Sequence, residues 1–294
     1  MHNIGGFYMT TIGFIGTGVM GASIVKHFLN AGHEVHIYSR TKAKAEPLIT
    51  LCAKWYSSAG EVAKESNVIF TMVGYPQDVE EVYFGDQGIF AMSKPGSIVI
   101  DMTTSQPTLA KKIAEHAKTL QIDALDAPVS GGDIGAQNGT LSIMVGGEKA
   151  VFDKVLPLLE VFGNNIVYQG QAGAGQHTKM CNQIAIATNM IGVCEAIAYG
   201  KKAGLDINTV LESISAGAAG SWSLSNLAPR MVKGDLEPGF YIKHFIKDMR
   251  IALEEAEIMH LELPGLALAK QMYDELSAKG DDNNGTQALI DYYK

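Results

Sequence analysis

Two hydrophobic patterns divide the chain. From Thr11 to about Tyr168, short runs of β-branched and apolar residues alternate with longer amphipathic stretches. This alternation indicates buried strands joined by helices, as in a parallel sheet with right-handed crossovers. The pattern predicts strands at 11–15, 34–38, 67–72, 97–101, 122–127, 141–145 and 165–168. It predicts helices near 19–30, 42–53, 58–65, 77–82, 106–118 and 148–159.

The second pattern begins beyond Gly175, where strand-like alternation stops and only helical periodicity remains. Helices are expected near 177–203, 207–215, 222–232, 243–260, 265–278 and 286–293. The first would be roughly 40 Å long, and because it is apolar nearly all round it should be buried between domains or subunits.

The expected fold is therefore α/β. It consists of an N-terminal Rossmann-type doubly wound parallel sheet and an all-α C-terminal domain, joined by a long helix. We expect the domains at 9–172 and 173–294.

A glycine-rich turn follows the first predicted strand, with the sequence Gly16-Thr17-Gly18-Val19-Met20-Gly21. Gly16 permits a tight turn, Gly18 lets the backbone approach a pyrophosphate, and Gly21 lets helix and strand pack closely. Phosphates would bind the free N–H groups at the positive end of the following helix. The run therefore predicts a dinucleotide site, although such glycines also occur in ordinary flexible turns.

The end of the second predicted strand indicates which dinucleotide binds. An NAD site usually has an acid there for the ribose 2′-hydroxyl, but this strand ends Tyr38-Ser39-Arg40-Thr41-Lys42, and Glu34 lies at its other end. Arg40, helped by Ser39, Thr41 and Lys42, would hold a 2′-phosphate. We therefore expect NADP, with NAD as the other possibility; a solvated basic loop is the alternative. At the end of the next strand, Met72 and Val73 are further expected cofactor contacts.

Composition narrows the function classes. The chain has 294 residues, 47% of them hydrophobic, and a net charge of −8 with no dense Lys/Arg tract. It therefore lacks the basic footprint of a nucleic-acid or anionic-membrane surface, and no apolar run matches a bilayer span. We interpret residues 1–8 as an extension before Met9, with no export signal.

The cysteines and histidines indicate neither disulfides nor a metal site. The chain has three cysteines, Cys52, Cys181 and Cys194. Because their number is odd and their spacing suggests neither a disulfide framework nor a metal site, they fit a reducing cytoplasm. We expect Cys181 and Cys194 to be buried small hydrophobes on one helix. The eight histidines form no ligand spacing, so no metal is expected.

Three segments carry candidate chemistry beside the nucleotide site. Asp101-Met102-Thr103-Thr104 and Asp126-Ala127-Pro128-Val129-Ser130-Gly131-Gly132 each end a predicted strand, where doubly wound folds bind ligands. The second offers a hydroxyl and bare N–H groups at an anion-binding turn, although alone it would be a plain surface turn.

The third segment runs from Gly173 to Gln183 and enters the long apolar helix. Lys179, Asn182 and Gln183 fall at i, i+3 and i+4, so they share one face. Polar groups on an apolar helix are costly to bury. Either Lys179 extends its ammonium to water, or it exchanges a proton with a carbonyl oxygen beside a nicotinamide.

These motifs, together with Phe245-Ile246-Lys247-Asp248, resemble the β-hydroxyacid dehydrogenase family. This is the group of 3-hydroxyisobutyrate dehydrogenase, tartronate semialdehyde reductase and glyoxylate/succinic semialdehyde reductases. The resemblance covers the chain from Met9. It implies that Lys179 is the general acid/base and that the substrate carboxylate is held by Ser130, Gly131 and Gly132.

The resemblance also implies that Thr104 and Lys247 contact the cofactor, and that Gln183, with Asn182, lies beside the substrate oxygen. Many family members have Asn where Gln183 stands, so which amide touches substrate is open. From periodicity alone, Lys247 would lie on a solvated helix face. Ser221-Trp222 would be a helix start with a packed aromatic; Ser221, Trp222 and Phe240 are also candidate pocket walls.

The expected function is an NADP-preferring oxidoreductase that interconverts a small β-hydroxy acid and its semialdehyde or keto acid. Imine reductases resemble this architecture but usually have another residue at the position of Lys179. Decarboxylating phosphogluconate dehydrogenases have a larger helical domain. A non-catalytic NADP-binding module is the alternative from another class. The partner would be a small carboxylate-bearing substrate, and the long apolar helix suggests a homodimer or homotetramer.

Overall fold

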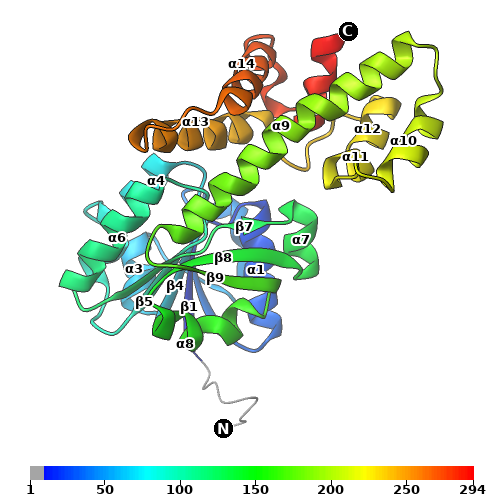
Figure 1. The fold of residues 1–294 in the computed structure, drawn as a ribbon. Helices are drawn as coiled ribbons and strands as arrows, with labels where there is room; N and C mark the ends of the chain where they lie inside the picture. The colour runs from blue at the N-terminus through cyan, green and yellow to red at the C-terminus, as the bar shows by residue number, and fades with distance from the viewer. Residues whose placement is uncertain (1–9) are drawn as a thin grey trace. The chain divides into compact units, whose positions relative to one another are not determined.

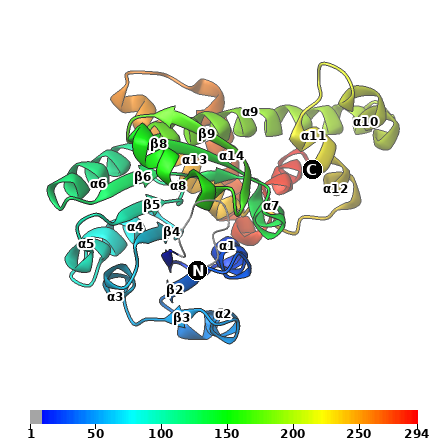
Figure 2. The ribbon, with the colours of Figure 1, turned by 90° about the horizontal axis from the view of Figure 1, so that it is seen from below.

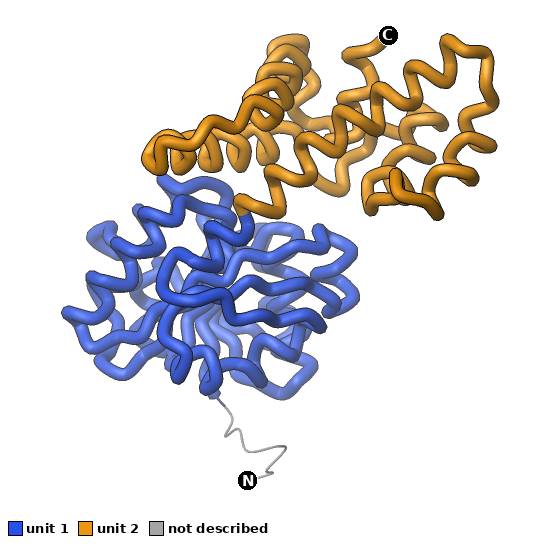
Figure 3. The backbone as a smooth tube through the Cα atoms, viewed as in Figure 1, with its two compact units in different colours: residues 1–179 blue, residues 180–294 orange. Residues whose placement is uncertain are grey.

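The structure is a computed structural model that describes residues 10–294, so the expectation about residues 1–8 and Met9 lies outside the described residues. The described chain forms two compact units, one ending at Lys179 and the other covering 180–294 (Figure 3). The first contains a sheet covered by helices, and the second consists of helices. The expected Rossmann-type domain followed by an all-α domain is confirmed.

One sheet organises the first unit (Figure 1). Its strands are β1 (Thr11–Ile15), β2 (Glu34–Tyr38), β3 (Lys54–Trp55), β4 (Val68–Thr71), β5 (Ile98–Asp101), β6 (Asp123–Asp126), β7 (Val129–Ser130), β8 (Leu141–Gly147) and β9 (Gly163–Gly170). Among the described residues the order is β3-β2-β1-β4-β5-β6-β8-β7, and β9 pairs with β8. The first six strands thus have the order 3-2-1-4-5-6 of doubly wound dinucleotide-binding folds.

Strand direction changes at β8, which the sequence pattern does not anticipate. β1 to β6 pair in parallel, whereas β8 runs antiparallel to both β6 and β7. The link from β6 to β8 contains only β7 and a short helix, so the chain does not cross back before β8 begins. β8 and β9 are connected by a longer helix and pair in parallel.

Helices cover both faces of this sheet (Figure 2). They are α1 (Val19–Asn30), α2 (Glu46–Thr50), α3 (Ala59–Lys64), α4 (Pro76–Phe84), α5 (Ile89–Met92), α6 (Pro107–Thr119), α7 (Gly132–Asn138) and α8 (Lys149–Leu159), with a 3-10 turn at Lys42–Lys44. Side chains alternate along each strand. In β4, Val68 and Phe70 join the core under α1, α2, α7 and α8, whereas Ile69 joins the core under α3 to α6.

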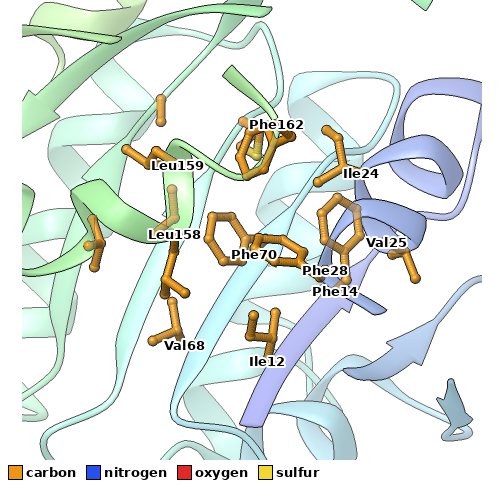
Figure 4. Close-up of a cluster of buried hydrophobic side chains, with 14 of the residues drawn as sticks. Ile12, Phe14, Ile24, Val25, Phe28, Val68, Phe70, Leu158, Leu159 and Phe162 are labelled. Carbon is orange, nitrogen blue, oxygen red and sulfur yellow. The ribbon is translucent and has the colours of Figure 1, made fainter. Parts of the chain in front are cut away.

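Aromatic rings fill the centre of the first of these cores (Figure 4). Phe28 of α1 lies 5.1 Å from Phe70 and 5.4 Å from Phe162, measured between ring centroids. Phe14 of β1 stacks on Phe70. These contacts join β1, β4 and α1, and so fix the strand and helix on either side of the glycine turn.

The local sequence explains where the helices and strands of the structure differ from those predicted. The helix predicted over 42–53 is the 3-10 turn followed by α2 and β3, because Pro47 starts a new helix and Cys52 adopts φ +75°. The sequence pattern does not predict four short elements, β3, β7, α5 and α7. Each has seven residues or fewer, which is too short for a clear periodic signal.

The second unit is built around the long helix α9 (Ala174–Lys202), whose first turns belong to the first unit. The other helices are α10 (Ile207–Ser215), α11 (Trp222–Asn226), α12 (Ala228–Lys233), α13 (Ile242–Ile258) and α14 (Pro264–Ala278), with 3-10 turns at Asp281–Asn283 and Thr286–Tyr293. α10, α11 and α12 gather along the C-terminal half of α9 (Figure 1). The predicted helix over 222–232 is divided into α11 and α12, because Pro229 begins the second.

Burial along α9 corrects one expectation. Cys194 is buried in the helical core, but Cys181 is exposed. Cys181 lies on the face of α9 that also carries the exposed Ala185 and Thr188. Other side chains of α9, Cys194 among them, pack into the helical core. No helix in the described part of the chain is both long and apolar enough to cross a membrane.

Candidate active site

The glycine turn between β1 and α1 has the geometry that the sequence predicts. Gly16 has φ +100°, and an added Cβ there would lie 2.0 Å from the Met72 carbonyl oxygen. A Cβ on Gly21 would lie 2.1 Å from the Gly16 carbonyl oxygen. At Gly18 an added Cβ meets no atom of residues 10–294 within 4 Å. Gly16 and Gly21 are therefore required by packing, whereas the space beside Gly18 is open.

The start of α1 is suited to an anion. Gly18 is its N-cap, and no described side chain caps the first turn, so its N–H groups are available to phosphate oxygens. The buried Thr17 hydroxyl has no hydrogen-bond partner within the described chain. A bound pyrophosphate would satisfy these donors, and the turn therefore fits the phosphates of a dinucleotide.

Arg40 follows β2 and pairs with a carboxylate from another element. Its Nη1 lies 3.0 Å from Asp78 Oδ1 in the first turn of α4, and its side chain is 80% exposed. Asp78 Oδ2 also accepts the Tyr75 N–H. Ser39 Oγ donates to the Thr41 carbonyl. Asp78 is not evident from the sequence, because it lies 38 residues beyond Arg40 and its only local signal is a helix start.

The ends of β4 and β5 are hydrogen-bonded to each other. The Val73 N–H donates to Thr103 Oγ1, and the Thr103 N–H donates to Asp101 Oδ1, both at 3.0 Å. Thr104 follows and is half-buried, as is Met72 at the end of β4. Met72, Val73 and Thr104 thus lie at the carboxyl edge of the sheet, the edge where such folds bind ligands.

Ser130, Gly131 and Gly132 form the turn from β7 into α7. Ser130 is half-buried and pairs with Ser142 of β8. Gly131 and Gly132 have φ of +130° and +61°, a region that other residues rarely adopt. Consecutive residues of this kind can direct N–H groups to one side and form an anion-binding concavity.

Asp126, at the end of β6, caps the first turn of α9. Its Oδ1 accepts the Gly173 N–H and its Oδ2 accepts the Gln176 N–H, both at 2.8 Å. Burial raises the pKa of this carboxyl, while the N–H groups oppose the rise. Gln176 is fully buried; its Nε2 donates to the Thr103 carbonyl at 2.7 Å and its Oε1 accepts the Ser105 N–H at 3.0 Å.

Lys179 lies one turn beyond Gln176 and is only 7% exposed. A snorkelling lysine would leave its ammonium in water, and this degree of burial disfavours that alternative. The first unit thus contains the glycine turn, the ends of β4, β5 and β6, and the start of the helix that carries Lys179.

Asn182 and Gln183 belong to a chain of polar side chains in the second unit. Asn182 Nδ2 donates to Gln183 Oε1 at 2.7 Å, and Gln183 Nε2 donates to Asp248 Oδ2 at 2.6 Å. Lys247 Nζ lies 3.0 Å from Asp248 Oδ1. Gln183 is buried and Asn182 only half-buried. Lys247 is buried as well, so the solvated face that periodicity predicts for it is wrong: α13 turns this residue toward the interior.

The three candidate pocket walls differ in exposure. Ser221 caps α11 through the Leu224 N–H at 3.0 Å, which confirms the helix start. Trp222 is 70% exposed, so the packed aromatic expected here is wrong; Ser223 and Leu224 are the residues of α11 that turn inward. Phe240 is partly exposed, with its ring 5.7 Å from that of Phe245.

Two family models match the chain in succession. Residues 11–170 match the NAD binding domain of 6-phosphogluconate dehydrogenase. Residues 173–293 match the NAD-binding domain of NADP-dependent 3-hydroxyisobutyrate dehydrogenase. The fold and the glycine turn therefore belong to a nicotinamide-dependent dehydrogenase.

Individual relatives agree with this class. The uncharacterized oxidoreductase YkwC of Bacillus subtilis is 64% identical over 95% of this chain and 97% of its own. The 2-hydroxy-3-oxopropionate reductase of Escherichia coli is 39% identical over 95% of each. A solved 3-hydroxyisobutyrate dehydrogenase from Mycobacterium tuberculosis, with L-serine, superimposes with a TM-score of 0.90 at 28% identity, covering 97% of this chain and 99% of its own.

The chain belongs to the β-hydroxyacid dehydrogenase family. It is an NAD(P)-dependent oxidoreductase that acts on the CH–OH group of a small hydroxy acid.

Proposed function

We propose that this enzyme is an NADP-preferring reductase that interconverts a small semialdehyde or keto acid and its β-hydroxy acid, with Lys179 as general acid/base. The burial of Lys179, one turn from a helix start held at the ends of β5 and β6, carries this proposal. A buried lysine is costly to maintain, and proton transfer at a carbonyl oxygen gives this one a role.

The cofactor supplies hydride when bound. We propose that the N–H groups from Thr17 to Gly21 hold its pyrophosphate, that Met72, Val73 and Thr104 line its nicotinamide half, and that Lys247 contacts it. The uncapped start of α1 and the unpartnered Thr17 hydroxyl support the first of these roles.

Arg40 would select NADP. Its guanidinium would bind a 2′-phosphate by charge-assisted hydrogen bonds, with Ser39 and Thr41 alongside. Its exposure supports this role, since four-fifths of the side chain is accessible to a ligand. Its partner Asp78 would compete with the phosphate for Arg40.

Ser130, Gly131 and Gly132 would bind the substrate carboxylate through the Ser130 hydroxyl and the N–H groups of their turn. Two relatives support a substrate of this kind, since one is a 2-hydroxy-3-oxopropionate reductase and the other is a 3-hydroxyisobutyrate dehydrogenase with L-serine, a β-hydroxy acid. Ser221, Trp222 and Phe240 would contact the remainder of the substrate.

Lys179 would complete the reaction. In reduction its ammonium donates a proton to the carbonyl oxygen as hydride arrives at the carbon, and in oxidation the amine takes that proton back. Asn182 would orient the same oxygen. Gln183 donates to Asp248 and accepts from Asn182, so we assign it to holding Asn182 rather than to touching substrate.

Assembly is a separate proposal. α9 exposes Ala185, Thr188 and Tyr199 within the described chain, and a second copy would cover such a face in a homodimer or homotetramer. Light scattering from the purified protein tests this, and a stable monomer would contradict it.

The function is tested by NADPH oxidation against glyoxylate and a panel of small semialdehyde acids, with NADH beside it. The proposal predicts turnover with NADPH on at least one of these acids. Tight NADPH binding with no turnover on any of them would favour a non-catalytic module or another substrate class.

A further inference from the structure

The helix that carries Lys179 is joined to the sheet by hydrogen bonds rather than by apolar packing alone. Asp126 caps its first turn, and the backbones there are very close. A Cβ on Gly175 would lie 2.4 Å from the Met144 carbonyl oxygen, and a Cβ on Gly146 would lie 2.7 Å from the Gly175 nitrogen. The first turn of α9 therefore rests directly on β6 and β8.

Gln176 makes the second connection, to the segment after β5. Its amide bonds both the Thr103 carbonyl and the Ser105 N–H, on either side of Thr104. Two hydrogen bonds from one planar amide fix both the distance and the rotation of this segment relative to α9. Thr103 in turn accepts the Val73 N–H after β4. A continuous chain of hydrogen bonds therefore runs from β4 through β5 to α9.

Lys179 follows Gln176 at i+3, so the two side chains are neighbours on the helix surface. A change at Gln176 would shift Lys179 relative to Thr104. An apolar residue of similar shape would leave the buried Thr103 carbonyl and Ser105 N–H without partners, at a cost of about 1–3 kcal/mol for each group. The amide therefore stabilises this junction, and the directionality of its two hydrogen bonds also fixes where the junction lies.

We propose that Gln176 is a positioning residue: through its amide it sets Lys179 in register with the cofactor-contacting segment 103–105. This inference rests on the proposed function, because it needs Lys179 as the acid/base and Thr104 at the cofactor. Asp126 fixes the same helix start from β6. Misplacement of a reacting group by about 1 Å costs about 100-fold in rate.

The test compares three variants of the full-length enzyme at a temperature where each is folded. Gln176→Met keeps the side-chain length but loses both hydrogen bonds, and kcat should fall about 10- to 100-fold, with a smaller change in the Kd for NADPH. Gln176→Glu keeps the acceptor for Ser105 and, when protonated, donates to Thr103. The kcat of Gln176→Glu should therefore either equal that of wild type, or approach it as the pH is lowered and the glutamate takes up a proton.

Thr178→Val is the matched control. Thr178 lies in the same turn and donates to Gln169 and to the Ala174 carbonyl, and within the described chain it makes no hydrogen bond to segment 103–105. Its kcat should stay within about threefold of wild type. The proposal is overturned if Gln176→Met keeps wild-type kcat, if Gln176→Glu is as slow as Gln176→Met at every pH, or if Thr178→Val is equally slow.

Lys179→Ala distinguishes the acid/base role of Lys179 from the positioning role of Gln176. If it retains turnover, the acid/base assignment is wrong, whatever the Gln176 variants show. If it abolishes turnover while Gln176→Met stays fully active, the acid/base assignment stands and the positioning role of Gln176 fails.

Discussion

Gly18 offers the sharpest separation of cofactor binding from folding. Its backbone, at φ −69° and ψ −171°, suits alanine, and an added Cβ meets no described atom within 4 Å. Alanine is a poorer N-cap than glycine by roughly 0.5–1 kcal/mol, while it restricts the unfolded chain and returns about 0.4–1 kcal/mol. Gly18→Ala should therefore leave stability unchanged within about 0.5 kcal/mol, a Tm shift of about 1–2 °C.

Gly21→Ala is the contrasting variant. Its Cβ would lie 2.1 Å from the Gly16 carbonyl oxygen and 3.1 Å from the Phe14 ring. Overpacking of this kind costs about 1–3 kcal/mol, and a loss of about 2 kcal/mol corresponds to a Tm decrease of about 4–8 °C in a domain of this size.

Cofactor affinity should distinguish the two variants in another way. If the pyrophosphate lies on the backbone at Gly18, a methyl group there displaces it, and Gly18→Ala should weaken NADPH binding at least about tenfold, or about 1.4 kcal/mol. Fluorescence titration with NADPH and thermal unfolding of the apo protein measure the two effects. Wild-type affinity in Gly18→Ala, or a Tm decrease as large as that of Gly21→Ala, would refute this reasoning.

Three further predictions follow from the site and the core. Arg40→Ala should raise the KM for NADPH much more than that for NADH in steady-state kinetics; equal changes would show that Arg40 does not bind the 2′-phosphate. Asp78→Asn should lower the KM for NADPH about two- to fivefold, because an exposed ion pair of this kind contributes about 0.2–1 kcal/mol; a rise would show that Asp78 orients Arg40 instead. Burial raises the pKa of Cys194 to about 12, so this thiol should react with a disulfide reagent at pH 8 only in denaturant, whereas the exposed Cys52 should react in the native protein; a Cys194 that reacts as fast as Cys52 would contradict its buried position.

The sequence anticipates what depends on local periodicity and on special backbone conformations. β1, β2 and α1 occupy their predicted residues, since an apolar strand, a glycine turn and an amphipathic helix are each defined within a few positions. Gly16 and Gly21 are required for the reasons expected, because the close backbone approach that they permit follows from the motif itself.

What the sequence does not anticipate depends on contacts between distant segments. Asp78 meets Arg40 only because α4 begins beside the end of β2. Gln176 meets Thr103 only because α9 starts over the end of β5. Trp222 is exposed because the five-residue helix α11 turns Ser223 and Leu224 inward instead. Neither of the two contacts nor the exposure of Trp222 has a periodic signal in the sequence, because each depends on tertiary packing.

We propose that Lys179 transfers the proton in an NADPH-dependent reduction. NADPH oxidation by wild type and by Lys179→Ala with a small semialdehyde acid, with the Kd for NADPH measured beside it, tests this role. Lys179→Ala should lose turnover by several orders of magnitude with the Kd nearly unchanged, because a general acid contributes about 10²–10⁴-fold. Turnover close to wild type in Lys179→Ala, or an equal loss of NADPH binding, would contradict it.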